Sequence, residues 1–460
     1  MIPLSLGEIA AITGGEPRGQ AVVTGPAVID SRRAVPGSLF AAIKGEHADG
    51  HDYAAPAMAA GAAAVLATRP VGPGVPCVLV PDIPAALAAL ASAVVGRLPR
   101  LAIAGITGSS GKTSTKDLTA QLAERLGPTV APEGSFNNEL GHPLTVLRAD
   151  GQTRYLVLEL SARGPGHIAA LCAIAPPRIG AVLNVGRAHA GEFGSLEAVT
   201  RAKGELPAAL PPDGVAILNA ADPRVLGMAA RTPARVVTFS AEGAADVRAA
   251  DVRLDELARP SFTLIMPGGS APVRMRLHGA HHVPNALAAA AIASELGMPP
   301  GDIAGALSAA TARSKWRMET TRRGDGVLVV NDAYNANPES VRAAIDALGH
   351  LAAGGRGFAV LGPMAELGEI SVASHEEVGQ RAARAGVAAL IAVGEDARPV
   401  LAGARREPGW QGEALAVPDA AAAVAALRNR LRPGDVVLVK ASRVAALWEA
   451  AAGLLTEVAG

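Results

Sequence analysis

The chain has 460 residues, half of them apolar, and this length suggests about three domains of roughly 150 residues each. Its 42 basic and 42 acidic residues give a formal net charge of zero, so charge gives no indication of a nucleic-acid or membrane partner. Two cysteines, Cys77 and Cys172, lie in apolar runs and are expected to be buried thiols. Free thiols fit a reducing cytoplasm, and no apolar run is long enough to insert in a bilayer, so we expect a cytoplasmic protein. We also expect it to be a monomer.

Residues 1–98 are expected to form a small α/β domain. Ser5 to Glu8 has the spacing of a capping box and opens a helix that ends near Gly14. Short β-like runs follow, separated by Gly/Pro turns, at residues 28–32, 38–43 and 64–66. The polar loop 44–51 is a solvated turn or a functional loop, and its composition leaves both open. An alanine-rich helix over 85–96 leads to the first boundary.

The next stretch has the order buried strand, glycine loop and helix. An apolar run over 101–106 predicts the strand, and leucines at 118, 122 and 126 predict the helix. Backbone amides and the positive helix end would bind a phosphate, Lys112 adds a cation, and the Thr113 hydroxyl can bind Mg²⁺. Ile106 stands where the general P-loop pattern has a glycine, so the spacing is offset. The predicted phosphate-binding loop is Thr107, Gly108, Ser109, Ser110, Gly111, Lys112 and Thr113.

Polar side chains gather at the predicted ends of neighbouring strands. Asn137 and Asn138 cap the following helix or bind a polar ligand, and the residues alone leave both open. Glu159 ends an apolar strand, where a carboxylate completes a Mg²⁺ site or forms a buried ion pair; the metal role is favoured. His189 follows the strand over 179–185 and is either structural or a ligand of a metal or phosphate. Lys203, on a predicted helix over 197–210, would by itself be an ordinary surface lysine.

Further strands are predicted at 215–218 and 236–239, with a β-hairpin formed by 262–266 and 273–277. Pro284 suits the first position of an alanine-rich helix that ends at Gly297. From residue 313, strands at 327–330, 358–361, 389–393 and 436–439 alternate with helices, which predicts a parallel sheet. In the loop after the first of these strands, Asp332 could bind ribose hydroxyls and Tyr334 could stack on a base; the alternative is helix capping.

Together these motifs resemble the Mur ligases of peptidoglycan synthesis. The loop Asn331 to Pro338 resembles the dipeptide-adding members, and the Asp-Asn-Pro-Arg signature expected of diamino-acid-adding members is absent. The Mur type of P-loop also explains the offset glycine. The stretches that carry the resemblance are 30–32, 37–40, 105–113, 136–143, Glu159, 184–189, Lys203, 279–285, Arg317, 331–338, 361–368 and 439–443.

The resemblance implies an α/β protein of three domains: 1–98 binding the UDP end of a substrate, 99–312 a P-loop ATPase-type sheet domain, and 313–460 a Rossmann-like domain closing over ATP and the amine. It implies ATP and Mg²⁺ as cofactors, and UDP-N-acetylmuramoyl-tripeptide and D-alanyl-D-alanine as substrates. Lys112, Lys203 and His189 would be catalytic. Thr113, Glu159, His189 and Lys203, the last as a carbamate, would surround Mg²⁺. Asn285, Arg317, Asp332 and Tyr334 would join the loop in binding nucleotide, and Ser31, Asn137, Asn138 and Asn335 would bind substrate.

The implied reaction is carboxylate activation by ATP through an acyl phosphate, followed by attack of the dipeptide amine. Two alternatives stay open. One is another amide ligase of this type, such as the third-residue-adding enzyme or a folylpolyglutamate synthase. The other is a non-enzymatic nucleotide-binding scaffold, against which the presence of Lys112, Glu159 and Lys203 argues.

Overall fold

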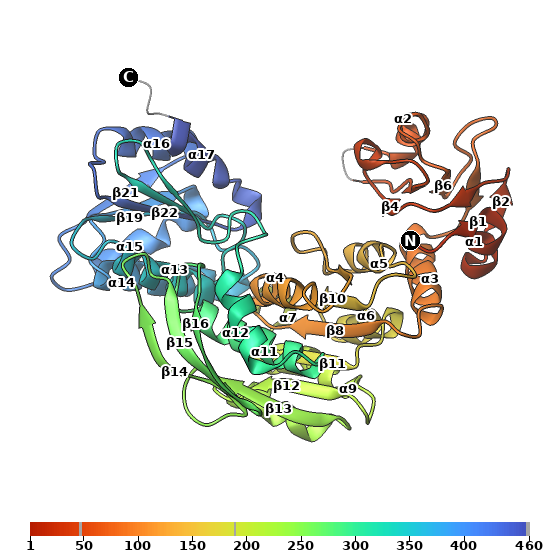
Figure 1. Ribbon diagram of the computed structural model, residues 1–460. Coiled ribbons are helices and arrows are strands. Elements are labelled where there is room, and N and C mark those ends of the chain that lie inside the picture. The colour runs from red at the N-terminus through yellow and green to blue at the C-terminus, as the bar shows by residue number, and fades with distance from the viewer. Residues whose placement is uncertain (46–47, 188–189, 457–460) are drawn as a thin grey trace.

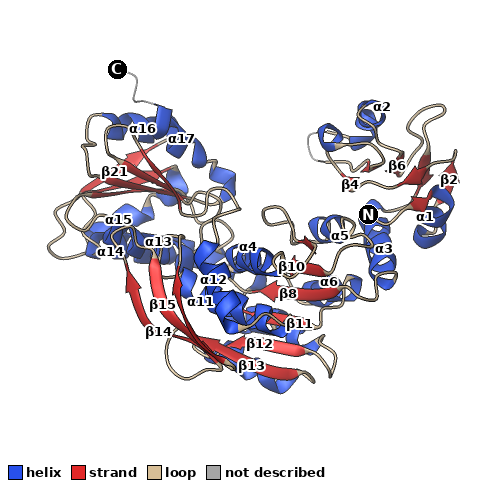
Figure 2. Ribbon diagram, viewed as in Figure 1, coloured by secondary structure: helices blue, strands red, loops and turns tan. Residues whose placement is uncertain are grey.

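The computed structural model describes residues 1–45, 48–187 and 190–456, and it contains three sheet-based units that follow one another along the chain. Figure 1 shows them as an open arc, with the N-terminal and C-terminal units at opposite ends and the central unit between them. Figure 2 shows that helices and strands alternate in all three. The predicted α/β class, with a small first unit, a central P-loop sheet and a Rossmann-like third unit, is confirmed.

The N-terminal unit is built on a five-stranded sheet of order β2-β7-β6-β5-β4 and a separate β1-β3 pair. The predicted capping box is present, because the Ser5 hydroxyl accepts from the Glu8 amide and the Glu8 carboxylate accepts from the Ser5 amide. Helix α3 packs on helices α5 and α6 of the central unit, so it joins the two units. The elements are β1 (Leu4–Ser5), α1 (Leu6–Thr13), β2 (Glu16–Arg18), β3 (Val22–Val23), β4 (Ala27–Val28), β5 (Leu39–Ala41), α2 (Ala54–Ala59), β6 (Ala64–Ala67), β7 (Cys77–Leu79) and α3 (Ile83–Gly96).

The central unit has a nine-stranded sheet of order β16-β15-β14-β13-β12-β11-β8-β10-β9. The strands from β9 to β14 run parallel, and β14, β15 and β16 pair antiparallel. Helix α4 follows β8, in the middle of the parallel part. The elements are β8 (Ala102–Thr107), α4 (Lys112–Ala123), β9 (Thr129–Val130), α5 (Gly141–Val146), β10 (Tyr155–Glu159), α6 (His167–Ile174), β11 (Ile179–Val182), α7 (Ala190–Phe193), α8 (Leu196–Lys203), α9 (Glu205–Ala208), β12 (Val215–Asn219), α10 (Pro223–Leu226), β13 (Arg235–Ser240), β14 (Val247–Leu254), β15 (Pro260–Met266), β16 (Gly269–Arg274), α11 (His282–Glu295) and α12 (Pro300–Ala309).

The C-terminal unit has a six-stranded sheet of order β17-β18-β22-β19-β20-β21, parallel except for the edge strand β17. Separate apolar clusters cover its two faces, one under α13 to α15 and the other under α16 and α17 (Figure 2). The elements are β17 (Glu319–Arg322), β18 (Leu328–Asn331), α13 (Pro338–Leu351), β19 (Gly357–Leu361), α14 (Ser371–Arg384), β20 (Ala389–Val393), α15 (Pro399–Arg405), β21 (Glu413–Val417), α16 (Ala420–Arg428), β22 (Val436–Lys440) and α17 (Trp448–Thr456).

Four local predictions are wrong. The second strand of the hairpin, expected over 273–277, is β16 at Gly269–Arg274, so the prediction overlaps it only at Val273 and Arg274. The run 28–32 is not one strand, because β4 ends at Val28 and a 3-10 turn begins at Ser31, where the Asp30 carboxylate accepts from the Arg32 amide. The helix expected over 197–210 breaks at Gly204 into α8 and α9. Pro284 is the third residue of α11, because that helix already begins at His282.

Cys77 and Cys172 are buried free thiols, as predicted. Within residues 1–45, 48–187 and 190–456, no helix has the length and apolar content needed to cross a membrane.

Candidate active site

The phosphate-binding loop joins β8 to α4 and is shaped by its glycines. Gly111 precedes the first helical residue and has a φ of 79°, in the left-handed region that favours glycine. A Cβ there would lie 2.4 Å from Oδ1 of Asn285, so a larger residue would also collide with that side chain. Gly108 has a similar limit, because its Cβ would lie 2.9 Å from Cβ of Leu183. Both positions therefore lack a Cβ atom, so a phosphate can approach the backbone closely at the helix N-terminus.

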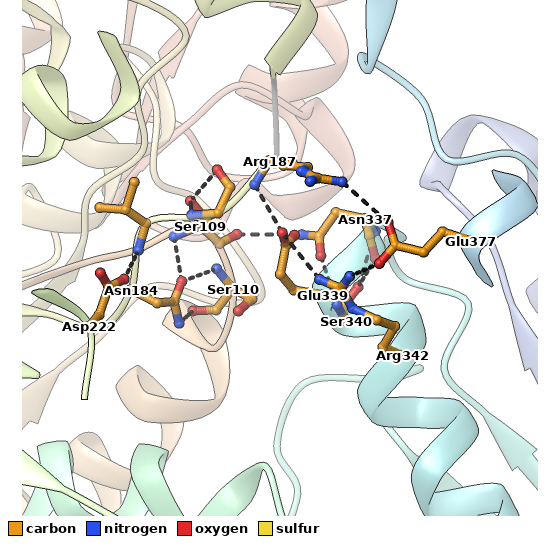
Figure 3. A network of polar contacts seen from close by, with 12 residues as sticks. Ser109, Ser110, Asn184, Arg187, Asp222, Asn337, Glu339, Ser340, Arg342 and Glu377 are labelled. Atoms are coloured by element: carbon orange, nitrogen blue, oxygen red, sulfur yellow. Dashed lines mark hydrogen bonds and ion pairs between the residues drawn. The ribbon is translucent and has the colours of Figure 1, made fainter. Parts of the chain in front are cut away.

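Asn184, beyond the end of β11, fixes the loop from the side (Figure 3). Its side-chain oxygen accepts hydrogen bonds of 2.9 Å from the amides of both Ser109 and Ser110, and its amide donates to the Ser110 carbonyl at 3.2 Å. The Ser109 hydroxyl accepts from the Gly186 amide at 2.8 Å. Asn184 belongs to the stretch 184–189 noted in the sequence, but its hydrogen bonds to the phosphate-binding loop were not predicted, since the two segments are over 70 residues apart.

Lys112, the first residue of α4, turns back over the loop. Its Nζ donates to the Gly108 carbonyl at 2.7 Å. Burial lowers the pKa of Lys112, the Glu159 carboxylate raises it in part, and the Arg317 guanidinium lowers it further. The side chain thus places a cation beside the loop amides, in the position expected for a phosphate-facing lysine.

Glu159 is the last residue of β10, and only 1% of it is exposed. Its Oε2 accepts from the Thr113 hydroxyl at 2.8 Å, and its Oε1 accepts from Nδ2 of Asn137 at 2.6 Å. The Thr113 oxygen in turn accepts from Nη2 of Arg317 at 2.8 Å. Thr113 and Glu159 therefore offer two adjacent oxygens, a donor set that fits Mg²⁺, which takes few protein ligands and completes its shell with water and substrate phosphates.

The two asparagines predicted together have different surroundings. Asn137 faces the Glu159 carboxylate, as the ligand-site interpretation requires. Oδ1 of Asn138 instead accepts from the amide of Gly141, the first residue of α5, at 2.9 Å, as the capping interpretation requires. Both side chains line the same cavity.

Lys203 ends α8 and is 5% exposed, so the surface-lysine alternative is wrong. Burial lowers its pKa well below the ordinary value, and the Lys112 ammonium lowers it further. His189, predicted beside it, lies outside the described residues.

The loop after β18 supplies the C-terminal wall of the site. The Asp332 carboxylate accepts from Nζ of Lys440 and, at 3.1 Å, from the Met318 amide. Arg317 stacks over the Tyr334 ring with its guanidinium carbon 4.3 Å from the centroid, and the Tyr334 hydroxyl bonds to that of Ser135. Asn335 is exposed, and its carbonyl accepts from Lys440 at 3.0 Å.

A cavity of about 450 Å³ lies between the central and C-terminal units. It brings together most of the predicted site. Thr107 and Gly108, at the start of the loop, and Lys203 are outside the lining, and Ser31 belongs to the N-terminal unit. The predicted residues that line the cavity are Ser109, Ser110, Gly111, Lys112, Thr113, Asn137, Asn138, Glu159, Asn285, Arg317, Asp332, Tyr334 and Asn335.

Two further residues, not predicted from the sequence, connect the units at the loop. Asn337, the N-cap of α13, places its Nδ2 3.5 Å from the Ser109 carbonyl, and Glu339 accepts from the Arg187 amide at 3.1 Å (Figure 3). The only local signal was helix capping around Pro338. Their partners lie in the other unit, which the local sequence does not reveal.

Known proteins with similar sequences agree with this arrangement along the whole chain. Three domain models match: the Mur ligase family catalytic domain over 27–95, the Mur ligase middle domain over 106–293, and the Mur ligase glutamate ligase domain over 316–443. The chain is 50% identical to "UDP-N-acetylmuramoyl-tripeptide--D-alanyl-D-alanine ligase" of Mycobacterium bovis, covering 99% of this chain and 98% of that protein. The chain belongs to the Mur ligase family.

This Mur ligase is also 36% identical to the Escherichia coli protein of the same name, over 98% of both chains. Among solved structures, MurF from Acinetobacter baumannii superposes with a TM-score of 0.87 at 31% identity, covering 99% of both chains. MurF ligase from Thermotoga maritima, solved in complex with ADP, superposes with a TM-score of 0.81 at 30% identity, covering 94% of this Mur ligase and 98% of that chain.

Proposed function

We propose that this Mur ligase joins D-alanyl-D-alanine to UDP-N-acetylmuramoyl-tripeptide with cleavage of ATP to ADP and phosphate. The observation that carries the proposal is the meeting of Lys112, Thr113 and Glu159 with the Asp332 to Asn335 loop around one cavity. This arrangement combines a phosphate-binding loop with polar groups from a second unit. The names of the full-length relatives and the ADP complex of one solved neighbour support it.

The three units divide the work in this proposal. Residues 1–98 hold the UDP end of the acceptor, with Ser31 among the contacts; residues 99–312 hold the ATP phosphates; and residues 313–460 hold the nucleoside through Asp332 and Tyr334. Asn285 and Arg317 complete the nucleotide contacts, and Asn137, Asn138 and Asn335 face the reacting ends of the substrates. We expect the enzyme to work as a cytoplasmic monomer.

The first chemical step forms an acyl phosphate. The terminal carboxylate of the tripeptide attacks the γ-phosphorus of ATP, the bond from that phosphorus to the bridging oxygen breaks, and ADP leaves. The carboxylate and the triphosphate are both anionic, so their approach is opposed by charge. Lys112 lies in the cavity to offset that repulsion, and the amides of the loop stabilise the departing ADP.

In the second step the dipeptide amine attacks the activated carbonyl carbon. The new C–N bond forms, the bond to the phosphate oxygen breaks, and the nitrogen loses a proton to the departing phosphate or to solvent. The protein contributes position and exclusion of water, since an acyl phosphate hydrolyses readily. A cavity bounded by two separate units suits this requirement, because closure of one unit on the other can seal it.

Thr113 and Glu159 would hold Mg²⁺, with Lys203, as a carbamate, and His189 near a second ion. Bound Mg²⁺ would neutralise triphosphate charge. The burial of Lys203 supports its part, because a carbamate forms from the neutral amine and burial beside Lys112 favours that form.

Mass spectrometry of the reaction products tests the assignment. With ATP, the UDP-linked tripeptide and D-alanyl-D-alanine, we expect a product heavier than the acceptor by the dipeptide less one water. Recovery of the unchanged acceptor together with ADP would show nucleotide hydrolysis without ligation and would contradict the proposal.

A further inference from the structure

The segment that links α12 to β17 carries Arg317, and its backbone is unusual there. Trp316 and Met318 have φ values of 59° and 51°, so left-handed residues stand on both sides of Arg317. Residues other than glycine rarely adopt this conformation, and each instance costs on the order of 1–3 kcal/mol unless its surroundings compensate. Something must therefore hold this turn in place.

Helix α4 holds the beginning of the segment. Asp117 and Gln121 of this helix and Glu124, its C-cap residue, follow one another on one side at spacings of four and three residues. Asp117 accepts from the Ser314 amide at 3.2 Å. Gln121 exchanges two hydrogen bonds of 3.0 Å with the Thr311 backbone, and Glu124 forms two hydrogen bonds with Arg313. These contacts end at Ser314, two residues before the turn.

The turn itself is held by the C-terminal unit. The Trp316 ring stacks on that of Trp448, the first residue of α17, with centroids 4.4 Å apart and an interplanar angle of 5°. The Trp316 carbonyl also accepts from the Tyr334 amide at 3.2 Å, and the Trp316 amide donates to Glu319 at 3.1 Å. The indole pair is the aromatic contact of the turn, and the side chain of Met318, buried in the apolar cluster under α13 to α15, is a second apolar contact.

The position of the Arg317 guanidinium depends on this turn. Its Nη2 reaches the Thr113 hydroxyl at 2.8 Å, and its plane covers Tyr334. Its Nε is buried and has no hydrogen-bond partner among the described residues, so no acceptor fixes that part of the group. A backbone shift at Trp316 would therefore move the guanidinium relative to Thr113.

We propose that Trp448 is a positioning residue for Arg317: by stacking on Trp316 it holds the left-handed turn that aims Arg317 at Thr113 and the phosphate-binding loop. The proposal rests on the proposed function, since it assigns Trp448 an effect on the use of ATP. It places a determinant of nucleotide geometry in the last helix of the chain, outside the cavity lining.

A double-mutant cycle tests this coupling. We expect Trp448→Ala to raise KM for ATP or lower kcat so that kcat/KM falls roughly ten-fold, and to cost less than about two-fold more when added to Arg317→Ala. Trp448→Phe keeps an aromatic ring and should recover most of the loss. Trp410→Phe, whose indole donates to the Val387 carbonyl away from the cavity, is the matched control and should keep the parental kcat/KM.

Trp316→Gly provides a second variant, because glycine accepts the left-handed φ but removes the ring. We expect the same loss as for Trp448→Ala, and no further loss on combining the two. Circular dichroism should show the exciton signal of the stacked indoles in the parent and its absence in both variants.

The outcomes separate the two proposals. A parent enzyme without ATP-dependent ligation would overturn the proposed function. An active parent whose Trp448→Ala and Trp316→Gly variants keep its kcat/KM for ATP would overturn the role of Trp448. So would a loss that is as large in the Arg317→Ala background as in the parent, because Trp448 would then act by another route.

Discussion

The backbone amide of Arg187 donates a hydrogen bond of 3.1 Å to Oε1 of Glu339, which joins the loop after β11 to the first turn of α13. One ion pair repeats this contact across the units, and two more lie within the C-terminal unit. The Arg187 guanidinium lies 3.2 Å from Oε2 of Glu377, and Arg342 pairs with both Glu377 and Glu339 (Figure 3). Nδ2 of Asn337 lies 3.5 Å from the Ser109 carbonyl, so α13 contacts both the loop after β11 and the phosphate-binding loop.

Glu339 should matter more than Glu377 in this network. The Glu377 side chain is 42% exposed, so its ion pairs contribute about 0–1 kcal/mol, whereas Glu339 contacts the Arg187 backbone and lines the cavity. We expect Glu339→Ala to lower kcat/KM for ATP roughly five-fold or more, and Glu377→Ala less than about two-fold. Steady-state kinetics on both variants measures this order. The reverse order would show that the exposed pairs, and not the backbone contact, hold the units together.

Lys112→Ala should abolish ligation without unfolding the protein. The change removes the cation that offsets charge at the γ-phosphate, and we expect kcat to fall by at least about a hundred-fold. Thermal stability should be unchanged or higher, because burial near Arg317 disfavours the charged Lys112 side chain in the folded state. The exposed Lys315→Ala variant is the matched control. Normal turnover of purified Lys112→Ala enzyme would refute the role of this loop.

Lys203→Ala should lose most activity, and short carboxylates such as acetate should restore part of it. The reason is that a carbamate on Lys203 would supply an anion to the metal, which a free carboxylate can replace. Arg201→Ala, an exposed change on the same helix, should stay active with or without acetate. A normal rate for Lys203→Ala would exclude the carbamate role. Loss of activity that acetate does not restore would point to a packing defect.

From the burial of His142 we predict how the free energy of unfolding changes as the pH falls. The side chain is fully buried, and desolvation of the charged ring lowers its pKa from 6.5 to about 4. Between about pH 6.5 and pH 4 the His142 ring is therefore protonated in the unfolded chain but neutral in the folded protein. The free energy of unfolding falls as the pH drops through this range, by about 3 kcal/mol in total.

His142→Leu should remove this part of the pH dependence, whatever it does to stability at neutral pH. Urea unfolding between pH 7 and pH 4 measures the effect, and His350→Asn controls for loss of a histidine outside that core. If parent and His142→Leu lose stability in parallel over this range, the buried ring is not the source of the acid sensitivity.

Sequence patterns correctly predicted the features that depend on residues close together in the sequence. The cap at Ser5, Pro338 at the start of α13, the phosphate-binding loop and the parallel strands of the third unit are all present. Strands β14, β17 and β21 were missed, because they are partly exposed and contain many charged or small residues, so they lack the apolar signal of a buried strand.

The missed parts of the site have a common cause. Glu339 and Trp448 act on partners more than 100 residues away, and their own neighbourhoods show only helix-forming residues. Lys203 is a residue whose burial the local sequence did not predict. Its sequence context indicated a surface lysine, and only the packing of α8 shows that it is buried.

The choice of amine is the central claim, and phosphate release measures it directly. The enzyme would be supplied with ATP, Mg²⁺ and the UDP-linked muramoyl tripeptide, with D-alanyl-D-alanine, meso-diaminopimelate or lysine as the amine. A parallel set would use the UDP-linked muramoyl dipeptide as acceptor. We predict that phosphate release requires the tripeptide acceptor together with D-alanyl-D-alanine. Release that instead requires the dipeptide acceptor and a free diamino acid would contradict the account and assign the chain to third-residue addition.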